Sequence, residues 1–184
     1  MNAKRLISVS MILMIALLLF GCSASSGASE PVDFSTLKTI GTQDGEYVSQ
    51  IAFENRSGFS ISALSVKRSQ TKEFTGNTLN KDDPFVYGET RLLCFASADP
   101  AADPESYEMS LVLGRDLFRT IHSIPFSLTD RCTLYSDGEF CYLEYVNQSG
   151  ERVSTRSLEK EFYHEEKARI DSAEGCIGSD GLVY

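Results

Sequence analysis

The sequence predicts a mainly β protein: an antiparallel β-sandwich of immunoglobulin-like character, with a C-terminal helix and an N-terminal signal helix. Short runs of period-two alternation recur from residue 47 to residue 155, and clusters of turn residues separate them about every 8–12 residues. No helical segments alternate with these runs, which disfavours parallel βαβ units. A small β-barrel is the alternative. The chain has no Trp, so it lacks the Cys–Trp–Cys signature of a true immunoglobulin domain.

The first 21 residues predict an export signal. Lys4 and Arg5 form a short positive head, and residues 6–20 are apolar except for Ser8 and Ser10. This stretch is shorter than the roughly 20 residues that a membrane-spanning helix needs. A positive head followed by a short apolar core is typical of a secretory signal peptide.

The motif that follows the apolar core is Leu19-Phe20-Gly21-Cys22. It resembles the lipobox of bacterial membrane lipoproteins. The resemblance implies cleavage before Cys22, attachment of diacylglycerol to its sulfur, and a place on the extracytoplasmic face of a bacterial cell membrane. The membrane is then the first expected partner, reached through the lipid on Cys22. Each buried methylene contributes about 0.8 kcal/mol, so two acyl chains hold a protein firmly where one holds it weakly.

The rest of the chain divides into three expected parts. Residues 22–33 are rich in Ser, Ala and Gly and predict a flexible linker. Residues 34–156 form the sandwich domain, and residues 157–184 form a C-terminal helix and tail. Loss of Lys4 and Arg5 leaves 15 basic against 26 acidic residues, a net charge of −11. Nucleic acid is therefore not an expected partner, because neutralising phosphates requires a basic stripe.

The strands are expected in a regular succession. The first two runs predict an antiparallel hairpin around residues 55–58, and residues 136–139 predict another. The expected strands cover residues 47–54, 59–67, 85–87, 91–96, 107–113, 117–124, 132–135, 140–146 and 152–155.

Residues 157–173 predict the only helix outside the signal. The segment is highly charged, with Leu158, Phe162 and Ile170 as apolar anchors against the sandwich. It is expected to be a solvated helix that leans on the sandwich with one side. Docking onto a partner protein is the alternative.

Four cysteines remain once Cys22 carries lipid: Cys94, Cys132, Cys141 and Cys176. Outside the cytosol an even set predicts two disulfides, and four cysteines allow three pairings. Short loop closure favours Cys132–Cys141, which leaves Cys94–Cys176 to hold the tail to the core. The first pair faces across the hairpin only if its loop is centred between Ser136 and Asp137; otherwise the bridge geometry is poor.

No motif for catalysis, metal or cofactor binding is visible, so the chain is expected not to be an enzyme. It has no C-x-x-C pair, no G-x-S-x-G elbow and no glycine-rich nucleotide loop. The only histidines are His122 and His164. His122 lies on the strand face opposite Ile121 and is expected to point outward and be hydrogen-bonded, whereas His164 is expected to be solvated.

Three functions remain open. The first is a non-enzymatic binding or interaction module on a lipid tether, recognised by an exposed aromatic or apolar patch on one face, drawn from Tyr87, Tyr107, Tyr142, Tyr145 or Phe126. The second is a cell-envelope hydrolase that uses His122 or His164. The third is an accessory subunit of an envelope complex that docks through the C-terminal helix. The runs starting at Phe53, Tyr107 and Cys141 are broadly similar to small β-sandwich lipoproteins of unknown function, and this resemblance transfers no functional residue.

Overall fold

The computed structural model describes residues 31–45, 47–68, 73–96 and 107–175, with side chains as far as residue 172. The predicted signal helix, most of the predicted linker and Cys22 lie outside these residues. The described elements, in chain order, are η1 (Phe34–Thr36), β1 (Thr39–Gly41), β2 (Val48–Arg56), β3 (Ile61–Arg68), β4 (Thr90–Ala96), β5 (Tyr107–Leu113), β6 (Leu117–Ile121), β7 (Arg131–Ser136), β8 (Cys141–Val146), β9 (Arg152–Ser154) and α2 (Arg156–Gly175).

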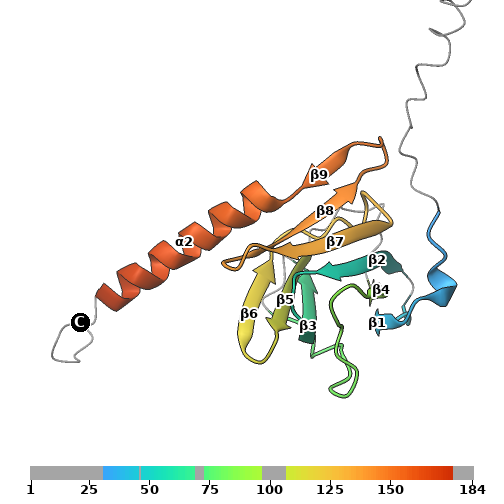
Figure 1. Ribbon diagram of the computed structural model, residues 1–184, viewed down its shortest axis with the longest axis horizontal. Coiled ribbons are helices and arrows are strands. Elements are labelled where there is room, and N and C mark those ends of the chain that lie inside the picture. Colours follow the sequence, from blue (N-terminus) through green and yellow to red (C-terminus); the bar gives the residue numbers. More distant parts are fainter. Residues whose placement is uncertain (1–30, 46, 69–72, 97–106, 176–184) are drawn as a thin grey trace, which may run out of the picture.

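The described chain contains two sheets, one α-helix and one short 3-10 helix, so the predicted mainly β architecture is confirmed (Figure 1). One sheet has six strands in the order β1-β4-β2-β7-β8-β9, and the other has three in the order β3-β5-β6. The hairpin predicted around residues 136–139 forms as the antiparallel pair β7–β8, and β5 and β6 also pair antiparallel. The expectation of purely antiparallel pairing is wrong, because β1 runs parallel to β4 and β2 runs parallel to β7.

The first predicted hairpin is also wrong. Strand β2 pairs with β4 and β7, whereas β3 belongs to the other sheet and pairs with β5. The turn at residues 57–60 therefore carries the chain from one sheet to the other. A hairpin and a sheet-to-sheet crossing share the same local pattern of two alternating runs around a turn.

The core lies between the two sheets. The six-stranded sheet contributes Ile51, Phe53, Leu93, Leu134 and Leu143, all essentially inaccessible to solvent. The facing sheet contributes Leu64, Val66, Met109, Leu111 and Ile121. Strand β5 alternates strictly between buried and half-buried residues, as a strand with one face on a core should.

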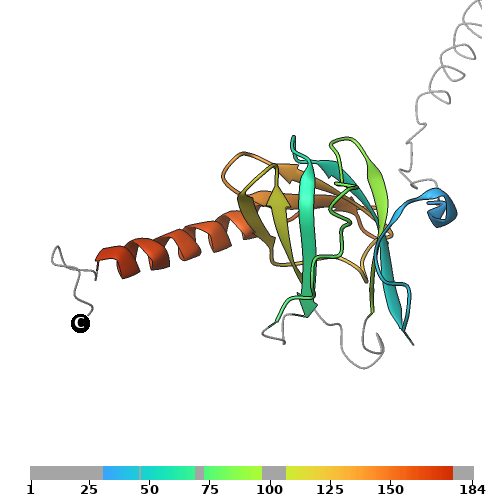
Figure 2. The same cartoon turned by 90° about the horizontal axis from the view of Figure 1, so that it is seen from below.

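Helix α2 begins directly after the edge strand β9. Thr155 fixes this junction, because its hydroxyl accepts a hydrogen bond from the Leu143 amide and its own amide donates to the Leu143 carbonyl, both at 2.9 Å. Figures 1 and 2 show α2 pointing away from the sheets, on the side of the molecule opposite η1 and β1. All residues from His164 to Ser172 are exposed.

The predicted apolar anchors of this helix are mostly wrong. Leu158 and Ile170 are exposed, and Phe162 is only half-buried. The residue that α2 buries is Glu159, which is 2% exposed. A charged group can replace an apolar anchor only when its hydrogen bonds are satisfied, and the site below supplies them. Within the described part of the chain, no helix combines the length and the apolar character that crossing a bilayer requires.

Candidate functional site

The buried Glu159 is held by His122, the residue that follows β6. One carboxylate oxygen accepts a hydrogen bond from the His122 amide at 2.9 Å, and the other lies 2.8 Å from His122 Nδ1. Phe162 stacks on the imidazole, with ring centroids 4.0 Å apart and an interplanar angle of 21°. Glu159, Phe162 and Tyr163 lie at helical spacings of three and four residues, so they share one face of α2.

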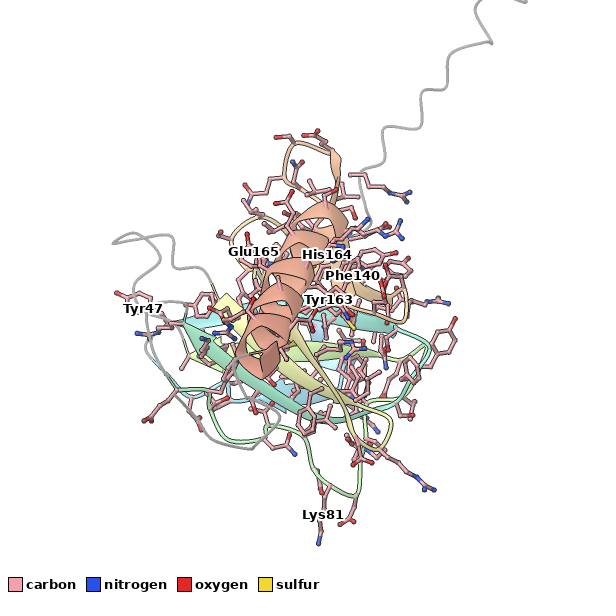
Figure 3. All side chains as sticks on the ribbon, turned by 90° about the vertical axis from the view of Figure 1, so that its left-hand side faces the viewer. Tyr47, Lys81, Phe140, Tyr163, His164 and Glu165 are labelled. Carbon is pink, nitrogen blue, oxygen red and sulfur yellow. The ribbon has the colours of Figure 1, made fainter. Side chains whose placement is uncertain are left out.

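A small cleft of about 180 Å³ opens beside this contact, between β6, the β7–β8 turn and the first half of α2. Phe118 stands at its edge and is 69% exposed, the largest exposed fraction among the large apolar side chains of the described chain. The rings of Phe140 and Tyr163 lie 6.0 Å apart, and Figure 3 shows both on the same side of α2, away from Glu165. The cleft is lined by Phe118, Arg119, Thr120, His122, Glu139, Phe140, Glu159, Tyr163 and Glu166.

Arg119 fixes the geometry of the cleft. Its two terminal nitrogens donate to the carbonyl oxygens of Phe118 at 2.8 Å and of Gly138 at 3.0 Å. The guanidinium therefore ties the open edge of the small sheet to the β7–β8 turn. Its Nε is buried and has no hydrogen-bond partner in the described structure. Glu139 and Glu166 add negative charge to the same lining.

This arrangement can bind a small group that combines an apolar part with a polar one. Exposed aromatic rings provide apolar contact. The engagement of His122 Nδ1 leaves Nε2 as the ring nitrogen that can donate or accept a further hydrogen bond. Glu159 holds His122 and main-chain carbonyls hold Arg119, so these two side chains require little ordering when a ligand enters.

The histidine predictions agree with the structure. His122 points away from the core and is hydrogen-bonded, as expected. His164 is exposed and is not part of the cleft lining. Sequence reasoning missed Glu159. Its helical spacing to Phe162 and Tyr163 was the available signal, but a glutamate in a charged helix is ordinarily solvated.

The predicted aromatic patch does not form. Of its five members only Tyr87 is exposed, whereas Tyr107 is buried, with its ring packed edge-on against those of Phe95 and Phe126. Phe126 and Tyr145 are partly buried against the core. Tyr107, Phe126 and Tyr145 therefore contribute to the packing of the core.

The favoured Cys132–Cys141 disulfide is wrong for this fold. Cys132 pairs with Tyr145 and Cys141 pairs with Ser136, so the two thiols are four strand residues apart, about 13 Å along β8. A disulfide requires Cα atoms within about 7 Å. The centre of the β7–β8 loop lies two residues later in the sequence than a Cys132–Cys141 pairing requires.

The three described cysteines are buried, and none forms a disulfide with another described cysteine. Burial raises the pKa of the Cys132 thiol far above its usual range, and it raises that of Cys141 to about 11 against the opposing hydrogen bond of Ser136. Burial also raises the pKa of Cys94, although Gln43 and Gln50 counteract it. Cys176 lies outside the described residues, so its pairing with Cys94 stays a prediction.

No metal-binding group of three or more His, Cys, Asp or Glu side chains occurs among the described residues. Comparisons with known protein families, curated proteins and solved structures found no match to this chain.

Proposed function

We propose that this chain is a bacterial membrane lipoprotein, anchored through lipid on Cys22 at the extracytoplasmic face. Its β-sandwich acts as a non-enzymatic binding module and takes a ligand or a partner's side chain into the cleft at the base of α2. The motif Leu19-Phe20-Gly21-Cys22 supports the anchor. The observation that carries the binding role is the exposure of Phe118 beside side chains that are already held in place.

A second candidate is a hydrolase that uses His122, and the distance between His122 and Glu159 favours it. A carboxylate on Nδ1 orients an imidazole in the way that catalytic triads require. The hydroxyl groups that share the cleft are those of Thr120 and Tyr163. We prefer the binding function to the hydrolase because Glu159 also accepts a hydrogen bond from the His122 amide. This second bond gives the pair a structural role in docking α2.

A third candidate is an accessory subunit that docks through α2. The exposed stretch from His164 to Ser172 favours it, since this part of the helix extends beyond the sheets. Its surface mixes both signs of charge and carries Ile170 as an exposed apolar residue.

Photo-crosslinking in growing cells tests the binding role. A benzophenone amino acid placed at Phe118 is expected to give a discrete adduct, seen as a higher intact mass. The matched position is Leu128, which is 48% exposed but does not line the cleft. An adduct at position 118 that is absent at 128 supports the proposal. The same yield at both positions, or none at 118, contradicts it. A third variant carries the benzophenone amino acid at Ile170, and an adduct from this position alone favours the accessory subunit.

A further inference from the structure

Three exposed apolar side chains lie on two turns of the sandwich that the Asn55 side chain joins. Phe59 lies in the turn between β2 and β3, and Val86 and Tyr87 lie in the turn before β4. Their exposed fractions are 40%, 45% and 56%. We call these three residues the apolar tip. Exposed apolar residues that occur together mark an interaction site more often than scattered ones do.

The tip is held rigidly by Asn55, whose side chain is completely buried. Its amide nitrogen donates to the carbonyl oxygens of Phe59 at 2.8 Å and of Phe85 at 3.0 Å, so one side chain joins both turns. Its main chain forms two more hydrogen bonds: the Asn55 carbonyl accepts from the Gly88 amide, and the Asn55 amide donates to the Glu89 carbonyl. The exposure of the tip is therefore a fixed feature of two well-bonded turns.

The segment that leads from Cys22 enters the fold beside this tip. Lys38 Nζ lies 3.2 Å from Asp83 and 3.9 Å from Glu89. Both acidic residues belong to the loop that carries Tyr87. The Lys38 carbonyl accepts a hydrogen bond from the Leu92 amide, which continues this contact into β4. Asp33 and Cys22 are 11 residues apart in the sequence, which limits their separation to about 40 Å.

The chemistry of the tip suits the surface of a bilayer. Tyrosine places an apolar ring and a hydroxyl at the boundary between hydrocarbon and water. The Arg56 guanidinium lies 5.9 Å from the centre of the Tyr87 ring and is ion-paired with Glu54 at 2.6 Å. Asp83 and Glu89 are paired with Lys38 and Arg91, and Glu54 is paired with Arg56, so each of these three carboxylates has a cationic partner.

We propose that the apolar tip inserts into the headgroup layer of the membrane that holds the lipid on Cys22, and thereby fixes the orientation of the sandwich. This inference rests on the proposed lipid anchor. The anchor supplies proximity, and the tip supplies a second, weaker contact that sets which end of the domain faces the bilayer.

Single-tryptophan fluorescence tests the proposal, because the natural chain contains no Trp. The full chain is expressed in bacteria as Tyr87→Trp and, as the matched control, as Phe74→Trp. Phe74 is 38% exposed and lies near the opposite end of β3, over Lys67. Each protein is extracted from the membrane and reconstituted into phosphatidylcholine vesicles with or without brominated acyl chains. Intact mass establishes whether it carries lipid.

Brominated lipid is expected to reduce the emission of the Tyr87→Trp chain by about twofold and to leave that of the Phe74→Trp chain unchanged, since only a shallowly inserted ring reaches the quencher. Adding Val86→Asp to the Tyr87→Trp chain is expected to abolish most of this quenching. If both chains carry lipid and the indole at position 87 is quenched no more than the indole at position 74, the membrane contact is overturned and the anchor stands. A protein that carries no acyl group overturns both the lipid anchor and the membrane contact of the tip.

Discussion

Replacing Asn55 with alanine is expected to lower the free energy of unfolding by about 3 kcal/mol or more. The buried amide donates to two carbonyl oxygens, and Asn55 Oδ1 accepts from the amide and the hydroxyl of Ser57 at 3.1 and 2.7 Å. Alanine removes these partners from two turns at once. Each buried polar group that is left unpaired costs about 1–3 kcal/mol.

Asn80→Ala is the matched control for this substitution. Asn80 is exposed, and its side chain accepts a hydrogen bond from the Asp82 amide in an open turn. Its loss is expected to cost about 0.5 kcal/mol, as for other surface changes. Urea unfolding followed by circular dichroism measures both variants. Equal losses would show that Asn55 does not hold the two turns as described.

Gly41→Ala is expected to cost about 3 kcal/mol, the second large effect. Gly41 has φ of +90°, and an added Cβ would overlap the carbonyl oxygen of Cys94, a main-chain atom that cannot rotate away. Because β1 is only three residues long and lies at the edge of the sheet, this clash is expected to detach β1 from β4.

Gly58→Ala is the control variant that separates the effect of the Cβ clash at Gly41 from the effect of the positive φ. Gly58 has nearly the same φ, +85°, but nothing lies within 4 Å of an added Cβ. It is expected to lose about 1 kcal/mol. The rate of trypsin cleavage after Lys38 provides a local readout, because a detached β1 exposes this bond. Faster cleavage is expected for Gly41→Ala only, and the same rate in both variants would contradict a close approach of β1 to β4.

Most strands could be predicted because their local pattern is unambiguous. Strand β5 is an example, since its alternation of Tyr107, Met109, Leu111 and Leu113 allows only one face to meet the core. Strand pairing could not be predicted in the same way. The turn after Arg56 has the composition of a hairpin, but the core is covered only if β3 crosses to the other sheet.

The register of β7 and β8 depends on a single loop. Its exact centre could not be derived from a cluster of four turn residues, and a shift of two positions was enough to move Cys132 opposite Tyr145. The Glu159–His122 contact could not be predicted from the sequence for another reason. Glu159 has the character of a solvated residue until β6 brings His122 to it from 37 positions away. Long-range hydrogen bonds of this kind leave no local pattern in a sequence.

The intact mass of the protein extracted from bacterial membranes tests the central claim most directly, with Cys22→Ser as the comparison. The natural chain is expected to lack residues 1–21, to carry a diacylglycerol on Cys22 and to stay with the membrane. The Cys22→Ser chain is expected to carry no lipid. A natural chain recovered with its first 21 residues attached and an unmodified Cys22 would contradict the account.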